Sequence, residues 1–176
     1  TIDGSDVGSF AMDPISADFD LNFKGEAIYF GTVKTAGTGS EFDGSLYKID
    51  TRELETPSSW TLQLVHDTER PITVRPTVAL DDNGERYVYV GTGRLLSPLD
   101  TGSTEQQRIY GIKDSSLSPT TTPAAPGLPV PAGGLRDVTS ASVTANGQVN
   151  GTQFDDYLNE FGNPTNPHLL RGFYRN

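Results

Sequence analysis

Cysteine is absent from this sequence of 176 residues, long apolar runs are missing, and basic residues are scarce. Without a thiol the chain can form neither a disulfide nor a cysteine-ligated zinc or iron–sulfur site. Without a long apolar run it offers no membrane-spanning helix. The 13 Lys and Arg residues face 23 Asp and Glu residues, a net charge of −10, which argues against a nucleic-acid partner.

The sequence also lacks the motifs of common enzyme sites. It has no Gly-x-Ser-x-Gly elbow, and its two histidines, His66 and His168, are the only imidazoles that could serve as a base. Gly91-Thr92-Gly93 lacks the third glycine and the following helix of a dinucleotide-binding loop. We therefore expect a protein that is not an enzyme, with each histidine either exposed to solvent or packed on a strand.

Glycine and proline are abundant, with 19 and 12 residues, and they separate short segments rich in β-branched and aromatic residues. Such segments predict strands and an all-β fold. Residues 45–50 and 60–65 alternate apolar and polar side chains, which predicts strands with one solvent-exposed face. Pro71 and Pro76 interrupt a further β-rich segment and favour an edge position for it. The other predicted strands cover residues 27–33, 87–93 and 108–114.

Two of these segments repeat at an offset of about 60 residues, within the range of a propeller blade with long loops. Residues 27–32 align with residues 87–92, and residues 45–50 align with residues 108–114 less one position. The repeat predicts about two blades of a β-propeller within residues 1–114; a meander or sandwich with similar strands is the alternative. The tyrosines at equivalent positions are expected to pack in the core or between blades: Tyr29, Tyr47, Tyr89 and Tyr110.

The remaining residues divide into two regions. Residues 115–134 are rich in Pro, Ser and Thr and predict an exposed, extended excursion between strands. Residues 135–176 predict further blade strands, resuming over residues 169–174, and one short helix over residues 154–158. The strand pattern is incomplete at the C-terminus, and two blades are too few to close a ring. We therefore expect this chain to need the remainder of a parent propeller or a partner chain.

Residues 18–26 are the strongest candidate for a binding site. Side-chain oxygens recur at the first, third, fifth and ninth positions, and the seventh residue can offer its main-chain carbonyl. This alternation lets a nine-residue loop wrap a hard cation, and calcium takes six to eight oxygen ligands. The alternative is an acidic turn that leads into a strand. The predicted calcium ligands are Asp18, Asp20, Asn22 and Glu26 through their side chains and Lys24 through its carbonyl.

Two positions in this loop depart from a helix–loop–helix calcium site. Phe23 occupies the place usually given to glycine for the sharp turn. Tyr29 stands where an EF-hand has its bidentate glutamate. The loop is therefore predicted to be a shortened one that runs directly into a β-strand.

Several motifs together resemble the PilY family of type IV pilus tip-associated adhesins and assembly proteins. The calcium loop and the strand segment after it are similar to the calcium-loop blade of that family. The resemblance covers most of residues 11–114 and, weakly, residues 135–176. The motifs that carry it, besides the loop, are Ala27-Ile28-Tyr29-Phe30-Gly31-Thr32, Gly44-Ser45-Leu46-Tyr47-Lys48-Ile49, Pro71-Ile72-Thr73, Arg75-Pro76-Thr77-Val78, Gly91-Thr92-Gly93-Arg94, Gln106-Gln107, Tyr110-Gly111-Ile112 and Arg171-Gly172-Phe173-Tyr174.

This resemblance implies a modified, quinoprotein-like β-propeller that is exported to the pilus tip or the bacterial outer surface. It implies a role in pilus biogenesis and adhesion, with calcium in the loop tied to whether the pilus stays extended against retraction. Minor pilins or the pilus tip would be partners, together with a surface or host receptor. The implied ligand set is again Asp18, Asp20, Asn22, Lys24 and Glu26.

Two other functions remain open from the sequence. One is a propeller enzyme related to the quinoprotein dehydrogenases, which share short glycine-rich strand repeats and often hold calcium beside the cofactor. The single Trp and the absence of a thiol count against it. The other is a structural propeller whose loop has lost its ion.

Overall fold

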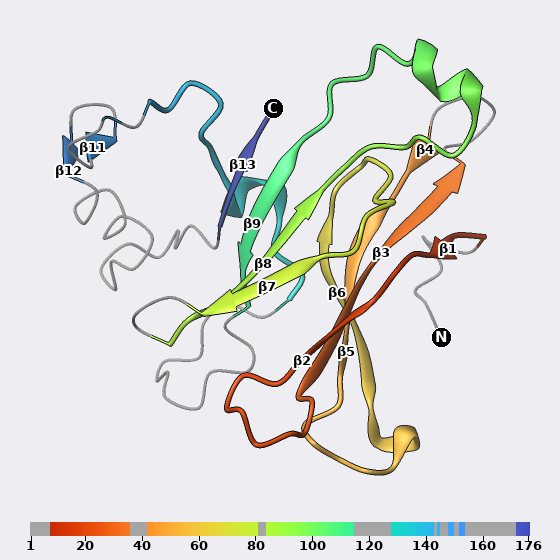
Figure 1. Cartoon of the computed structure of the whole chain (residues 1–176), viewed down its shortest axis with the longest axis vertical. Coiled ribbons are helices and arrows are strands. Elements are labelled where there is room, and N and C mark those ends of the chain that lie inside the picture. The colour runs from red at the N-terminus through yellow and green to blue at the C-terminus, as the bar shows by residue number, and fades with distance from the viewer. Residues whose placement is uncertain are drawn as a thin grey trace.

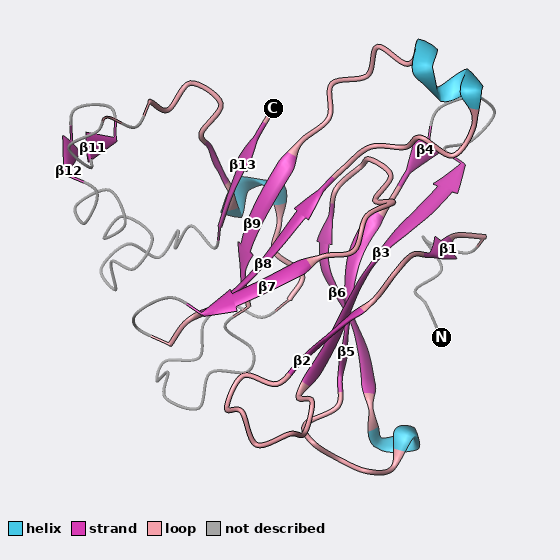
Figure 2. Cartoon of the chain, viewed as in Figure 1, coloured by secondary structure: helices cyan, strands magenta, loops and turns pink. Residues whose placement is uncertain are grey.

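The computed structural model describes residues 8–35, 42–80, 84–114, 128–142, 144, 148–149, 152–153 and 172–176. Two main β-sheets make up most of this part of the chain (Figure 1). Short 3-10 helices are its helical elements (Figure 2), namely η2 (Pro57–Ser59), η3 (Pro98–Gly102) and η5 (Ala132–Gly134). The predicted all-β fold is therefore confirmed. The short helix predicted over residues 154–158 lies outside the described residues.

The first sheet has six strands, each antiparallel to its neighbours. Strands β3, β5 and β6 lie side by side, and the short strands β1, β2 and β4 pair with β3. The three longer strands cover the predicted segments, because β-branched and aromatic residues suit a pleated, partly buried surface. The bounds are β1 (Phe10–Ala11), β2 (Ile15–Ala17), β3 (Ala27–Thr35), β4 (Phe42–Asp43), β5 (Ser45–Asp50) and β6 (Thr61–Asp67).

The second sheet has the order β10-β13-β9-β8-β7, and only the pair β10–β13 is parallel. Strand β7 lies at the edge of the sheet, as Pro71 and Pro76 predict. A separate pair consists of β11 (Gln148–Val149) and β12 (Thr152–Gln153). The bounds in the second sheet are β7 (Thr77–Leu80), β8 (Arg86–Gly91), β9 (Ile109–Lys113), β10 (Arg136–Asp137) and β13 (Gly172–Arg175).

The two aligned repeats lie in different sheets. Strands β3 and β5 pair in the first sheet, and β8 and β9 pair in the second, both antiparallel. The C-terminal strand β13, dark blue in Figure 1, lies beside β9 and extends the second sheet. Each repeat is thus the centre of one sheet, and the number of blades in a complete propeller stays a prediction.

The hydrophobic core joins the two sheets. Residues of the first sheet bury one face against residues of the second, and Val130 and Leu135 belong to the same core. The buried members of the core are Ala17, Ala27, Tyr29, Leu46, Val65, Ile72, Val88, Val90, Tyr110, Ile112, Val130 and Leu135.

Strand β5 does not have the solvent-exposed face that its alternating sequence predicts. Five of its six residues are buried, and Lys48 is 0% exposed. The second sheet covers the Lys48 side, and the ring of Tyr47 stacks on that of Phe30 on the other side, with centroids 5.8 Å apart. Both faces of β5 are therefore buried, and one of them holds a polar residue, Lys48, whose bonding partner is buried as well.

The tyrosines at equivalent repeat positions do not share one environment. Tyr29, Tyr47 and Tyr110 are at most 1% exposed, as predicted, but Tyr89 is 36% exposed. In β8 the residues on either side of Tyr89 are buried instead, with Val88 at 0% and Val90 at 3% exposure. In a propeller, the front face of one sheet packs against the back face of the next. Residues at aligned positions of two repeats can therefore have different surroundings.

Part of the proline-rich region is also packed more closely than predicted. Residues 115–127 lie outside the described residues, and Pro129 and residues 131–133 are exposed as expected. Val130, however, is 1% exposed. Its backbone N–H donates to the Val65 carbonyl at 2.8 Å, and its side chain joins the core. The prediction of an exposed excursion is therefore wrong at this residue.

Candidate metal centre

The loop of residues 18–26 connects β2 to β3 at the lower end of the first sheet (Figure 1). These strands are antiparallel neighbours, with Ala17 opposite Ala27, so the loop begins and ends at one place. The Glu26 N–H donates to the Ala17 carbonyl at 2.9 Å and closes the base of the loop. The sequence-predicted path, a short loop that runs directly into a strand, is confirmed.

The carboxylate of Asp18 organises the turn. It accepts hydrogen bonds from the backbone N–H groups of Asn22 at 3.2 Å and Phe23 at 2.7 Å. Leu21 and Phe23 have φ angles of 60° and 68°, a left-handed conformation that non-glycine residues rarely adopt. Phe23 therefore takes the conformation for which glycine is usual at this position, while its ring is 99% exposed.

Three carboxylates converge inside the loop. One ligand atom from each of Asp18, Asp20 and Glu26 lies within 4.8 Å of the others. Oxygens on opposite sides of a calcium ion lie about 5 Å apart, because each calcium–oxygen distance is 2.3–2.6 Å. Among the ion pairs of the described residues, none involves these three carboxylates. The cluster could therefore hold a metal ion that offsets the mutual repulsion of its charges.

Glu26 is the most constrained member of the cluster. It is 8% exposed, and its Oε2 accepts a hydrogen bond from the Phe19 N–H at 2.8 Å. Its carbonyl accepts hydrogen bonds from the N–H groups of Thr51 and Arg52, which follow β5. The Thr51 hydroxyl also donates to the Gly25 carbonyl. Hydrogen bonds thus hold Glu26, the last predicted ligand, both to Phe19 in the loop and to the residues after β5 in the first sheet.

Asn22 and Lys24 lie in the same loop, but the structure gives them other contacts. The Asn22 side-chain amide donates to Asp20 Oδ2 at 2.9 Å, and its Oδ1 accepts a hydrogen bond from the Lys24 N–H at 2.8 Å. Both residues are exposed. Their predicted roles, an amide oxygen and a main-chain carbonyl for the ion, stay predictions.

Phe19 connects this loop to the second sheet. Its ring packs against the core, and the guanidinium of Arg86, in β8, lies 4.9 Å from the ring centroid. A cation at this distance is attracted to an aromatic face. An ordered loop therefore contacts both sheets.

His66 is packed on a strand, one of the two environments predicted for it. It is 3% exposed, its ring lies 5.2 Å from that of Tyr110, and its Nδ1 lies 2.7 Å from the Val130 carbonyl. Because a carbonyl only accepts, Nδ1 carries the proton. Burial lowers the pKa of His66 below its usual 6.5, so the ring is held neutral. The predicted exposure or packing of His168 lies outside the described residues.

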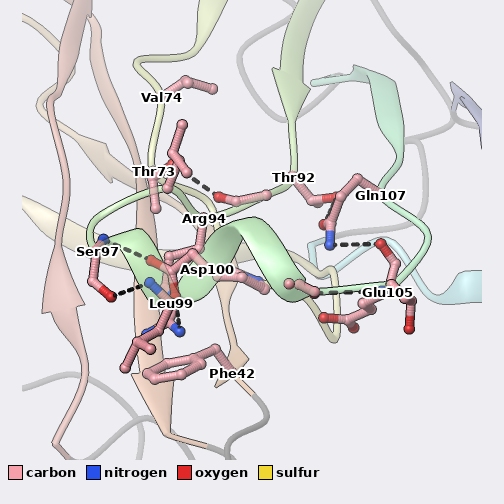
Figure 3. A pocket seen from close by; sticks show the side chains of 16 residues that line it. Phe42, Thr73, Val74, Thr92, Arg94, Ser97, Leu99, Asp100, Glu105 and Gln107 are labelled. Atoms are coloured by element: carbon pink, nitrogen blue, oxygen red, sulfur yellow. Dashed lines mark hydrogen bonds and ion pairs between the residues drawn. The ribbon is translucent and has the colours of Figure 1, made fainter.

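A cleft of about 1200 Å³ lies beside η3 (Figure 3). Helix η3 is at the opposite end of the sheets from the loop of residues 18–26 (Figure 1). Asp100 fixes the wall of this cleft, because its carboxylate pairs with Arg94 and accepts hydrogen bonds from the N–H groups of Leu96 and Ser97 at 2.8 Å. The Ser97 hydroxyl in turn accepts from the Leu99 N–H at 3.1 Å, which completes a capping box. Sequence reasoning missed this wall, although Ser97-Pro98-Leu99-Asp100 carries the spacing that signals it.

Comparisons with known proteins agree with this fold. No protein-family model and no curated protein sequence matches the chain. Among solved structures, the chain matches the structure of an all-β domain of a pilus protein and shares its fold. That structure is the crystal structure of the Pseudomonas aeruginosa PilY1 C-terminal domain, with a TM-score of 0.59 and 16% sequence identity. The match covers 95% of this chain and 39% of that one, so the chain spans well under half of the PilY1 domain.

The structural match confirms the fold that the PilY resemblance implies. At 16% identity it establishes the fold and leaves the function to be proposed. Within the described residues, no helix has the length and apolar character needed to cross a membrane.

Proposed function

We propose that this chain is a calcium-binding segment of a type IV pilus-associated protein that takes part in pilus biogenesis and surface adhesion. The observation that carries this proposal is the shared fold with the PilY1 C-terminal domain over 95% of the chain. The carboxylate cluster in the β2–β3 loop adds to it, since the same loop motif resembles the PilY family. The protein acts as a binding and assembly module and not as an enzyme.

Calcium suits this loop better than the other common divalent ions. The predicted donors are all oxygens, which excludes ions that prefer sulfur or imidazole. Magnesium demands near-ideal octahedral geometry and keeps several waters, whereas calcium accepts six to eight oxygens in a flexible arrangement. Asp18, Asp20 and Glu26 supply the charge, and Asn22 and the Lys24 carbonyl complete the protein ligands once the exposed turn rearranges around the ion.

The ion acts by selecting one conformation of the loop. Without it, three close carboxylates repel one another and favour a spread loop. With it, the exposed Asp20 is tied to Glu26, which is held at the start of β3. A ligand that binds only the ordered loop stabilises that state by mass action. Because Phe19 extends from this loop to the second sheet, the ion also stabilises the contact between the sheets.

The place of action is the pilus tip or the bacterial outer surface, outside the cell. The partners are minor pilins or the pilus tip, the remainder of a parent propeller or a partner chain, and a surface or host receptor. Calcium concentrations are high outside cells, so a site of modest affinity is filled there.

The pilus role is tested in the organism that makes this protein. An antibody raised against the purified chain is used to probe pili sheared from the cells, with cells lacking the major pilin as the control. We expect the parent protein in the sheared fraction of piliated cells and its loss from that fraction in the control. Its confinement to the cytoplasm of piliated cells would refute the pilus role. A bound quinone in the absorbance spectrum would instead favour a quinoprotein-like enzyme.

A further inference from the structure

A buried group of three polar side chains lies between the two sheets. Lys48 Nζ, from β5, lies 2.8 Å from Oδ2 of Asp114, which follows β9. The Tyr29 hydroxyl, from β3, donates to the same Oδ2 at 2.7 Å. Tyr29 and Lys48 are cross-strand neighbours, so the carboxyl group of Asp114 receives both donors from one face of the first sheet.

This group is closed off from water. The side chains of Lys48 and Asp114 are both 0% exposed, and Tyr29 is also 0% exposed. None of the three lines the cleft beside η3 or the smaller cleft beside Trp60. A charged pair in such surroundings loses the hydration that stabilises ammonium and carboxylate in water. Conversion of the pair to an amide and water, both neutral, therefore removes a desolvation cost that an exposed pair does not carry.

A second buried carboxylate, Asp50, belongs to the same strand as Lys48. Asp50 follows Lys48 by two residues in β5, so both side chains lie on the same face of the strand. Asp50 is 4% exposed, and its Oδ2 lies 3.2 Å from Arg52 Nε. Its other oxygen, Oδ1, is buried and has no hydrogen-bond partner among the residues that the structure describes. An orphaned buried oxygen is costly for stability, and such atoms mark strained or reactive sites.

We propose that Lys48 and Asp114 condense to form an intramolecular isopeptide bond that joins the two sheets. Lys48 Nζ forms a bond to Asp114 Cγ, and the bond from Cγ to Oδ1 breaks. The ammonium form of Lys48 carries three protons, of which one stays on the amide nitrogen and two leave with Oδ1 as water. The pair is neutral overall before and after the reaction, and no oxidant, reductant or cofactor is needed.

The neighbouring side chains supply what the reaction requires. Asp50 Oδ1 accepts a proton from the attacking amine and returns it to the departing oxygen, so Asp50 is unchanged at the end. The Tyr29 hydroxyl donates to Oδ2, where negative charge develops as the amine adds to the carboxyl carbon. Burial and the adjacent Asp114 charge raise the pKa of Tyr29, which keeps this donor protonated. The fold holds amine and acid together, which replaces a bimolecular encounter.

Two partly exposed lysine–carboxylate pairs in the same molecule provide an internal comparison. Lys113 Nζ lies 3.0 Å from Glu85 Oε1, close to the separation of the buried pair, but their side chains are 20% and 24% exposed. Water stabilises the charged forms there and competes with the reaction. Lys34 Nζ likewise lies 3.3 Å from Asp43 Oδ2, with side chains 18% and 27% exposed. Among the described residues, proximity alone therefore predicts three cross-links, whereas proximity in a dry site predicts only the one at Lys48.

The mass of the intact, purified chain tests the proposal. Under denaturing conditions we expect a mass below that of the sequence by one water. After trypsin digestion, residues 35–52 should appear joined to residues 114–136, with no cleavage after Lys48. A cyclised Asp-Gly pair such as Asp43-Gly44 also loses one water, but it does not join two peptides. An intact mass equal to that of the sequence, or a mass loss without the joined peptides, would overturn the proposal.

Variants separate the roles of the residues. Asp114→Ala should restore the full mass, and Lys113→Ala, which removes the partly exposed pair with Glu85, should retain the loss of one water. Asp50→Asn keeps Lys48 and Asp114 but removes the proton acceptor, so the linked fraction shortly after synthesis should be lower than in wild type. Equal linkage in Asp50→Asn would exclude Asp50 from the reaction. The wild-type mass decides the main question even if a variant does not fold.

Discussion

His66 is a titratable ring held neutral inside the fold, which makes stability depend on pH. Burial lowers its pKa in the folded state below the usual 6.5, so the unfolded chain binds a proton more readily. Its contribution to stability is then fully present above about pH 6.5 and is lost as the pH falls towards the folded-state pKa. We expect the wild-type free energy of unfolding, measured in denaturant with a calcium chelator present, to fall between pH 7.5 and 5.5.

The matched variant for this prediction is His66→Asn. The amide of Asn can still donate to the Val130 carbonyl, which His66 Nδ1 contacts at 2.7 Å, but it does not titrate in this range. The variant should lose less stability than wild type over the same interval. An equal or steeper loss in the variant would assign the pH dependence to the acidic side chains instead.

The sequence predicts some of these residues and not others. Asp18, Asp20 and Glu26 are close in the chain, so the spacing of their oxygens sufficed to predict that they converge. Lys48 and Asp114 are 66 residues apart, and no local pattern brings them together. Their contact depends on how one sheet stacks on the other, which a single sequence does not encode in any short motif.

Strand β3 passes so close to the segment before β7 that one of its residues has no room for a side chain. A Cβ on Gly31 would lie 2.1 Å from Ile72 Cγ2 and 3.2 Å from the Ile72 carbonyl oxygen, and Ile72 is 0% exposed. We expect Gly31→Ala to lower the free energy of unfolding by about 1–3 kcal/mol, because overpacking displaces a buried side chain. Denaturant titration of both proteins measures the difference.

The repeat offers a control for that substitution. Gly91 aligns with Gly31, but a Cβ there would meet nothing within 4 Å. Gly91→Ala should therefore change stability by no more than about 0.5 kcal/mol. Similar losses in both variants would show that the cost arises from the strand backbone and not from contact with Ile72.

The sequence predicts the positions of the strands better than it predicts which of their faces are buried. The β-branched and aromatic runs placed β3, β5, β6, β8 and β9 within a few residues of their bounds. Alternation in β5 nevertheless predicted a solvent-exposed face where the strand is buried on both sides. A polar residue that faces a buried partner and a polar residue that faces water give the same alternating sequence. Only the position of the neighbouring sheet distinguishes the two cases.

At the largest scale, the described residues form two main sheets stacked on a shared core. The loop of residues 18–26 lies at one end of them, and η3, which borders the cleft, lies at the other (Figure 1). This arrangement matches 39% of the PilY1 C-terminal domain. The outer face of the second sheet carries Tyr89 and Phe173, whose rings lie 6.3 Å apart over Gly111. In a complete propeller, the next blade would cover such a face.

Calorimetric titration of calcium into the purified chain tests the central claim most directly. We expect one site per chain, with a dissociation constant on the order of 10⁻⁶ to 10⁻³ M, and binding at least about tenfold weaker in Asp20→Ala. Asp13→Ala removes the same charge from an exposed residue outside the loop and should bind calcium as wild type does. No binding heat from wild type, or equal affinity in wild type and Asp20→Ala, would contradict the account.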